Sequence, residues 1–199
     1  MVVIRYLGIY DTNKEIIFKA MTSKKVFYKV RILNIGTLNI SVQELSQIIG
    51  SYTKEISIEK MNSEITFAEI IRNAPNIEVL KIFHNTWISK QTTWLEDLYK
   101  YKEGKNFREL LIYLNNIEFD IETLEKFVKT KSINQVFIRI RYENKEKQKA
   151  YHQFVDKMSK SFNSSPDDDG ISNIRLEFDG IKDYKCFYIR HRNKNDGPP

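Results

Sequence analysis

The chain has 199 residues, of which 41% are hydrophobic, 29% charged and 13% aromatic, and its formal net charge is +6. This length and composition fit one folded domain with a sizeable core and exclude wholesale disorder. A single cysteine, Cys186, excludes an internal disulfide and a cysteine-based zinc cluster. The sequence shows neither a signal peptide nor an apolar run that would span a bilayer, so we expect a cytoplasmic or nuclear protein without a membrane partner.

Six short segments share one pattern, with apolar residues at the first, fourth and sixth places and Thr53 as an exception. They are 30–35, 53–58, 77–82, 107–112, 133–138 and 171–176. Successive segments begin between about 23 and about 38 residues apart, and a period of roughly 20–29 residues with an L-x-x-L-x-L core is typical of leucine-rich repeats. Such units stack because none buries its apolar face alone. We therefore predict an α/β fold, a leucine-rich-repeat-like strand–helix solenoid with a mostly parallel sheet of about six strands, outer helices and a C-terminal β-hairpin.

The segments between these strands carry helix signals. Capping residues for four helices are expected at Ser41 with Glu44, Thr66 with Glu69, Thr93 with Glu96, and Asp120. Gly50 stands where a left-handed residue would end the first helix. A strand followed by a helix, four times over, is the arrangement that stacked repeats require.

Residues 1–192 are predicted to form one domain, followed by a flexible tail at 193–199. Its parts are an N-terminal cap (1–26), the repeats (27–142), and a C-terminal helix and hairpin (143–192). The cap should hold a strand at 2–7 and a short helix or strand at 15–21. The last part should hold a helix at 143–162 and antiparallel strands at 171–178 and 184–189. The alternative is an ordinary α/β domain whose strands share a pattern only because all are buried.

Catalytic motifs for nucleotides, metals and nucleophiles are absent from the sequence. His84, His152 and His191 lie in separate segments, and Cys186 falls inside an expected strand, where a structural thiol is the usual role. We therefore expect no enzyme, no catalytic residues, no metal and no cofactor. A hydrolase that depends on Cys186 is the remaining catalytic alternative.

The residues between the repeated apolar positions should point out from the sheet, because side chains alternate along a strand. On this basis the predicted protein-binding residues are an apolar centre of Phe83, Leu111, Tyr113 and Phe137 and a charged rim of Lys81, Arg139 and Arg141. Aromatic patches edged by charge are typical of protein-binding hot spots. The partner would be another protein. The alternative is that the terminal hairpin or a partner domain covers this face and makes it core.

The charge of the chain supports a second interpretation. Basic residues gather late in the sequence, at Arg139, Arg141, Lys145, Lys147, Lys149, Lys157 and Lys160. Such clustering suits contacts with phosphates, so a nucleic-acid-binding protein that uses the basic C-terminal third is the alternative function. Acidic residues are interleaved with the basic ones, and no known nucleic-acid-binding motif accompanies them.

Three stretches carry a family resemblance: NFRELLI at 106–112, IEFDIETL at 117–124 and NIRLEFDG at 173–180. With the wider stretch 27–141, they resemble the leucine-rich-repeat-like domains of nematode F-box proteins, often called F-box-associated or FTH domains. The resemblance implies a substrate-recognition module that brings target proteins to a cullin-type ubiquitin ligase. Residues 1–26 show no F-box, so the chain is either a fragment or a relative that binds without recruiting the ligase.

Overall fold

The computed structural model describes residues 2–10, 23, 28–38, 41–61, 65–84, 88–116, 119–142, 148–162, 172–178 and 184–189. Their strands are β1 (Val2–Ile9), β2 (Tyr28–Leu38), β3 (Glu55–Met61), β4 (Val79–Ile82), β5 (Phe107–Leu114), β6 (Ser132–Tyr142), β7 (Ser172–Phe178) and β8 (Lys185–Ile189). Their helices are α2 (Val42–Ile48), α3 (Phe67–Asn73), α4 (Trp94–Tyr101), α5 (Ile121–Lys131) and α6 (Gln148–Ser161), with a short 3-10 helix η1 (Ile88–Lys90). The expected element at 15–21 and the expected tail at 193–199 lie outside the described residues.

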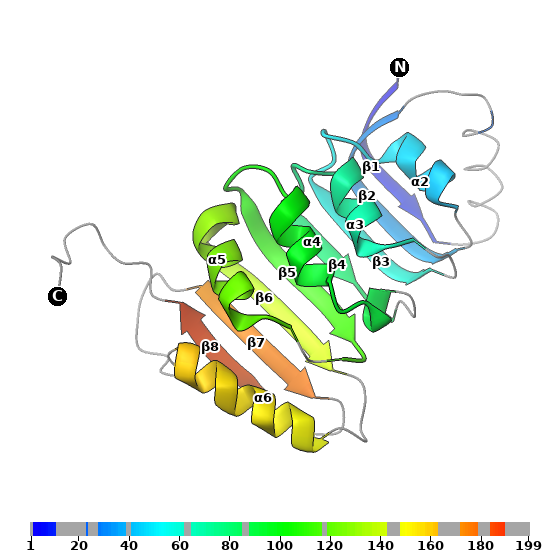
Figure 1. Cartoon of the computed structure of the whole chain (residues 1–199). Coiled ribbons are helices and arrows are strands. Elements are labelled where there is room, and N and C mark those ends of the chain that lie inside the picture. Colours follow the sequence, from blue (N-terminus) through cyan, green and yellow to red (C-terminus); the bar gives the residue numbers. More distant parts are fainter. Residues whose placement is uncertain are drawn as a thin grey trace, which may run out of the picture.

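The eight described strands form one sheet, and their spatial order from β1 to β8 follows the chain (Figure 1). Neighbouring strands from β1 to β7 are parallel, whereas β7 and β8 are antiparallel. The prediction of an α/β fold with a mostly parallel sheet is thus confirmed. The described sheet has more strands than the six expected, because β1 and β8 also pair with it.

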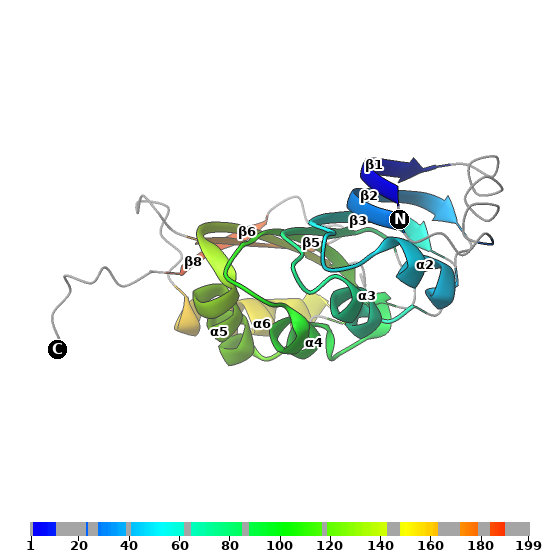
Figure 2. The same cartoon turned by 90° about the horizontal axis from the view of Figure 1, so that it is seen from above.

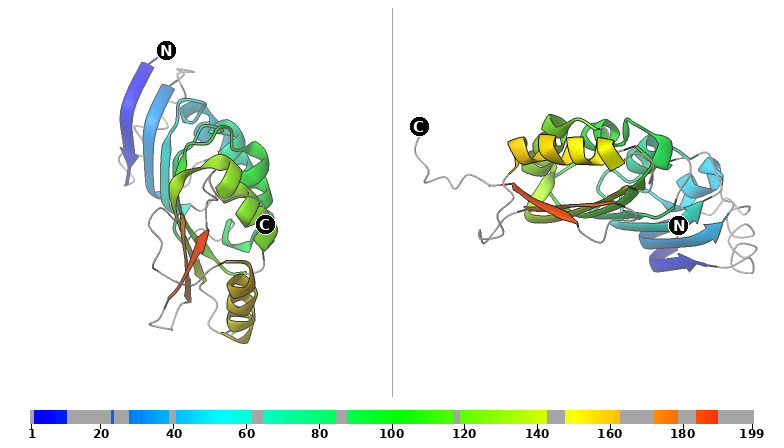
Figure 3. Two further views of the ribbon diagram at one scale, coloured as in Figure 1. Left: turned by 90° about the vertical axis from the view of Figure 1, so that its left-hand side faces the viewer. Right: turned by 90° about the horizontal axis from the view of Figure 1, so that it is seen from below.

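The helices lie on one side of the sheet (Figure 2), and Figure 3 shows α6 on that same side, with β1 and β8 at opposite ends. Helix α6 presents the apolar stripe expected from the sequence, which comprises Tyr151, Phe154, Val155 and Met158, followed by Phe162. The Tyr151 hydroxyl donates a hydrogen bond of 3.3 Å to the backbone carbonyl of Leu176 in β7. Helix α6 is therefore fastened to the C-terminal part of the sheet by both apolar and polar contacts.

The core lies between the sheet and the helices. Two rows of aliphatic side chains cross β2 to β7 in register: Leu33, Ile56, Leu80, Leu110, Ile138 and Ile174, and then Ile35, Ile58, Ile82, Ile112, Ile140 and Leu176. Each of these side chains is at most 1% exposed. Burying one such side chain contributes about 1.5–3 kcal/mol, so the two rows are a principal source of stability.

The fifth repeated segment sits two residues later than its sequence pattern predicts. Ile138 lies opposite Leu110, the place that the pattern gave to Val136, and the register shifts between Phe107 and Glu109. Ile133, expected to be buried, is 36% exposed. A two-residue shift keeps the same side chains on the buried face, because the side-chain period of a strand is two. The sequence pattern is therefore compatible with either register.

Three of the four predicted helix caps are confirmed: Ser41 with Glu44, Thr66 with Glu69, and Asp120. The predicted box of Thr93 with Glu96 is wrong, because Thr93 makes no side-chain cap bond. Its hydroxyl instead lies 3.1 Å from Oδ2 of Asp97, one residue further along the helix. Gly50 is not a left-handed cap either, since its φ is not positive and Ile49, the C-cap residue of α2, is extended.

We predict that Ile140→Asp unfolds the protein whereas Ile133→Asp does not. An uncompensated carboxylate in the core costs several kcal/mol, which approaches the whole free energy of unfolding of a typical domain, about 5–15 kcal/mol. Circular dichroism during urea denaturation would measure both variants. If Ile133→Asp proved as destabilising as Ile140→Asp, the result would support the register expected from the sequence pattern, in which Ile133 is buried.

Candidate functional site

The side of the sheet opposite the described helices is the candidate binding surface, and we call it the open face. Figures 1 and 2 show that the described helices leave this side of the sheet uncovered. Strand alternation directs every second side chain of β2 to β8 toward it. Strands β7 and β8 extend the sheet at its edge, so these two strands do not lie over the open face. The alternative in which the terminal hairpin buries this face is therefore wrong for the described strands.

An aromatic cluster lies where β4 and β5 end on the open face. The ring centroid of Tyr113 is 5.4 Å from that of Phe83 and 4.8 Å from that of His84. The guanidinium of Arg141 lies 5.3 Å from the Tyr113 ring centroid. His84 has a φ of 40°, which is uncommon for a residue other than glycine and often marks a functional position. Adjacent ends of parallel strands thus bring three rings together.

An arginine block lies beside this cluster; we define it as Arg139, Arg141, Arg175 and Glu177. In the register of β6 and β7, Arg139 lies opposite Arg175, and Arg141 lies opposite Glu177. Oε1 of Glu177 is 2.7 Å from Nε of Arg175 and 3.4 Å from Nε of Arg139. One carboxylate is therefore shared between two guanidinium groups.

Aromatic rings lie close to both of these guanidinium groups. Arg175 lies 3.6 Å from the ring centroid of Tyr184, and Arg139 lies 5.5 Å from that of Phe137. Cation–π contacts of this kind stabilise by about 0.5–1 kcal/mol at exposed sites and hold the planar guanidinium in a fixed orientation. The arginine block is thus held in place by neighbouring side chains.

A hollow of about 470 Å³ opens on the same face, over β2 to β5. Its lining residues are Ile32, Asn34, Glu55, Ile56, Ser57, Val79, Lys81, Arg108 and Glu109. Its charged side chains pair with one another: Nζ of Lys81 is 2.9 Å from Glu109, and an Nη of Arg108 is 3.1 Å from Glu55. The two cations of the hollow are thus neutralised by two carboxylates that also line it.

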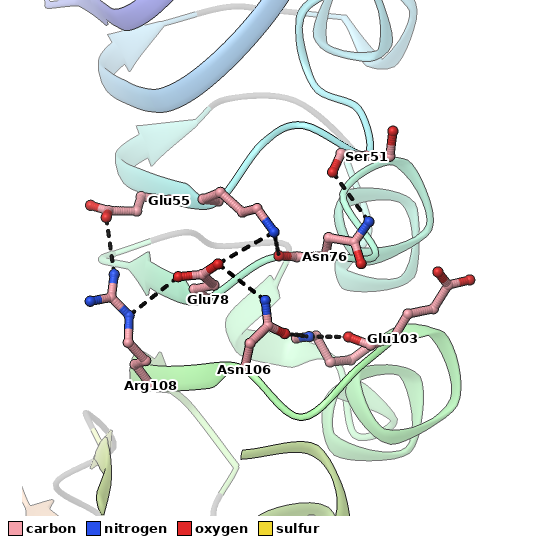
Figure 4. A network of polar contacts seen from close by, with 9 residues as sticks. Ser51, Glu55, Asn76, Glu78, Glu103, Asn106 and Arg108 are labelled. Carbon is pink, nitrogen blue, oxygen red and sulfur yellow. Dashed lines mark hydrogen bonds and ion pairs between the residues drawn. The ribbon is translucent and has the colours of Figure 1, made fainter. Parts of the chain in front are cut away.

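A ladder of polar contacts runs along the edge where β3, β4 and β5 begin (Figure 4). Lys54, Glu78 and Arg108 each follow the first residue of a repeated segment, and their charges alternate. Glu78 lies 3.3 Å from Nζ of Lys54 and 3.5 Å from Nε of Arg108. The Asn106 side-chain amide donates to Glu78 over 3.1 Å. Equivalent positions in successive units therefore contact each other directly.

Lys102 adds a buried cation next to this ladder. The residue is 0% exposed, and its ammonium donates hydrogen bonds to Oδ1 of Asn106, at 2.7 Å, and to the backbone carbonyl of Glu103 (Figure 4). Burial lowers the pKa of Lys102 to about 8, and the positive charges of Lys54 and Lys131 act in the same direction. Sequence analysis missed this residue, because a lysine after a helix of mixed polarity is normally solvated.

The structure brings together most of the predicted site residues, in two groups. Phe83, Tyr113 and Arg141 form one group, and Phe137 and Arg139 form the other. Leu111 lies between them but is only 6% exposed, so it forms the floor of the surface. Lys81 is paired with Glu109 in the hollow. Arg175, Glu177, His84 and Tyr184 were not among the predicted site residues.

Three of the residues considered for catalysis lie on different elements, and His191 lies outside the described residues. Cys186 lies half-buried in β8, His84 follows β4, and His152 lies on α6. In the part of the chain that the structure describes, no group of three or more His, Cys, Asp or Glu side chains could hold a metal ion. Among the described helices, none combines the length and the apolar character that crossing a membrane requires.

Comparison with known proteins yields no relative: no protein-family model matches the chain, and neither does any curated protein or solved structure.

We predict that Lys102 makes stability rise with pH between about 8 and 10.5. Because the folded-state pKa is lowered, the unfolded chain binds more protons than the folded chain in this range, so raising the pH favours folding. Below pH 8 the full cost of the buried charge is present. Wild type should therefore gain about 1–3 kcal/mol relative to Lys102→Met as the pH rises from 7 to 10.5.

Urea denaturation of both proteins at several pH values would measure this gain. Lys100→Met is the matched control, since Lys100 is exposed on α4, and its pH profile should follow that of wild type. Parallel profiles for wild type and Lys102→Met would show that the Lys102 ammonium is solvated.

Proposed function

We propose that the protein is a non-catalytic protein-interaction module that binds a partner protein on its open face. The observation that carries the proposal is the set of aromatic and arginine side chains that adjacent strands align there, with Phe83 and Tyr113 at one end and Phe137 and Arg139 at the other. Binding hot spots are enriched in aromatic residues and arginine. A rigid sheet beneath them reduces the entropic cost of ordering these side chains on binding.

We further propose that the sheet is a leucine-rich-repeat-like solenoid. The support is a backbone bond that recurs at equivalent positions: Lys54 N–H donates to Arg31 O, Glu78 N–H to Lys54 O, and Arg108 N–H to Glu78 O, at 2.8, 2.7 and 2.7 Å. Each of these residues is the second of its repeated segment. In a solenoid each unit contacts its neighbours through the same positions, as these bonds do.

The resemblance to F-box-associated domains suggests which protein-binding role this surface serves. On that basis we propose a substrate-recognition module for ubiquitin-ligase targeting, in the cytoplasm or nucleus. The open face would bind the target protein, because its exposed aromatic and charged residues are the kind that bind other proteins. Recruitment of the ligase would need a further segment or a further protein.

Nucleic-acid binding is the second candidate, and arginines beside aromatic rings on a sheet favour it. Bases stack on exposed aromatic side chains, and arginine contacts phosphates. Binding to a random single-stranded RNA and to duplex DNA across a salt series tests this function. A steep loss of affinity with salt, without sequence preference, would favour the nucleic-acid-binding alternative over the protein-interaction module.

We predict that a photo-crosslinking residue at Tyr113 or Phe137 captures a partner protein in an extract of the source cells. The same residue at Tyr52 is the control, since Tyr52 is 55% exposed and lies in the turn before β3. Adducts removed by protease but not by nuclease would identify a protein. Adducts that appear equally at Tyr52 would remove the support for the open face.

The captured partner then allows a quantitative test. Tyr113→Ala and Phe137→Ala should each weaken its binding by more than about 30-fold, because truncating a central aromatic commonly costs about 2 kcal/mol or more. Both variants should keep a melting temperature close to that of wild type, since both side chains are only half-buried. Full affinity in both variants, or a loss of stability as large as that of Leu110→Ala, would refute the proposal.

A further inference from the structure

Arg139 and Arg175 together carry more positive charge than Glu177, the carboxylate that they share, balances. Arg139 and Arg175 are register partners on adjacent parallel strands, and like charges at such positions repel each other. Their Nε atoms both face the same oxygen, Oε1 of Glu177. Each guanidinium has five N–H donors, so one shared carboxylate leaves most of these donors for another acceptor. The two side chains remain 34% and 28% exposed.

Both arginines are oriented in a way that favours a carboxylate ligand. The rings of Phe137 and Tyr184 lie beside the guanidinium groups, and Glu177 contacts each group through Nε. Arginine binds carboxylates with two parallel hydrogen bonds, and a guanidinium already fixed by its neighbours loses less entropy in doing so.

The hollow over β2 to β5 differs from this arginine pair, because its charged side chains are paired with one another. In the hollow, Lys81 pairs with Glu109 and Arg108 pairs with Glu55, while Ile32 and Val79 supply apolar contact. The open face therefore combines a positive region over β6 and β7 with a charge-balanced hollow over β2 to β5. A ligand of complementary chemistry carries acidic groups at one end and uncharged residues at the other.

We propose that the open face binds an acidic peptide segment of the partner protein, whose carboxylates pair with Arg139 and Arg175 while its uncharged residues lie over the hollow. This inference rests on the proposed function and names the chemistry of its partner. A nucleic acid fits less well, because its phosphates repeat along the strand and would approach Glu55, Glu109 and Glu177 on the same face.

The sharpest test is selection of random 12-residue peptides displayed on phage against the complete chain. Enriched peptides should carry clustered Asp and Glu residues. A synthetic copy of the best peptide should bind the double variant Arg139→Gln with Arg175→Gln at least about 10-fold more weakly in fluorescence anisotropy. The double variant Lys126→Gln with Lys160→Gln removes the same charge from α5 and α6 and should bind within about 2-fold of wild type.

Glu177 offers a test in the opposite direction. The Glu177 carboxylate repels the acidic groups of a peptide that binds beside it, so Glu177→Gln should tighten binding of the acidic peptide by about 2- to 5-fold. This variant also keeps the test valid if the double arginine variant is unstable, because it removes a charge without deleting either guanidinium. An unchanged or weaker affinity would contradict the inference.

Other outcomes separate this inference from the proposed function. If the selected peptides lack acidic residues yet compete with the protein crosslinked at Tyr113, the acidic chemistry is wrong and the protein-interaction module stands. If no peptide is enriched, or the lysine control weakens binding as much as the arginine variant, the inference fails. If a random 20-nucleotide RNA binds and the arginine variant abolishes that binding, both the inference and the proposed function give way to the nucleic-acid alternative.

Discussion

The in-register stacking of two aliphatic rows across β2 to β7 is the constraint on which the other features depend. Parallel strands paired in register place equivalent residues of each unit side by side, so that Leu80 meets Leu110 and Ile82 meets Ile112. The same register aligns the residues between them on the other side of the sheet. A slip of one residue would move the whole row from the core to solvent, and burial therefore fixes the pairing strongly. The way in which the core packs therefore determines which side chains lie next to one another on the open face.

The ladder of polar contacts repeats regularly from unit to unit, whereas the buried lysine departs from this repetition. The residues that end α2, α3 and α4 are Ile49, Ala74 and Lys102, all buried and each donating its backbone N–H to the carbonyl four residues earlier. Lysine at this place requires acceptors for its ammonium, which Asn106 and the Glu103 carbonyl provide. Such a buried cation lowers stability in comparison with an apolar residue. The surface ion pairs of the ladder add little, about 0–1 kcal/mol each, so their regular spacing is more informative than their energy.

The strands, most helix starts and the stripe of α6 could be predicted from the sequence because each depends on a local period or a local cap. The register of β6 could not, since moving from Val136 to Ile138 leaves the buried face unchanged and only the extra residues near Ile133 reveal the shift. For the candidate site, Tyr113 and Phe137 were predicted from strand alternation alone. The contact of Arg175 with Glu177 follows from the same alternation, because the two residues lie two positions apart on β7. The contacts of Glu177 with Arg139 and of Tyr184 with Arg175 were missed, because they depend on how β6, β7 and β8 pair, which no local pattern encodes.

The position of the arginine block follows from the same pairing and bears on its role. Two arginines opposite each other on neighbouring strands are unfavourable for stability, and a neutral pair such as Ser57 and Asn34 occupies the corresponding place between β2 and β3. Within the arginine block this cost is offset by Glu177 and by two aromatic rings, an arrangement that keeps the charges on the surface instead of removing them. Because the fold does not need these charges, a ligand that completes their pairing gives the simplest physical reason for their presence. The open face is then best understood as a preorganised binding surface. The arginine block contributes to recognition, and the aliphatic rows beneath the sheet contribute the stability.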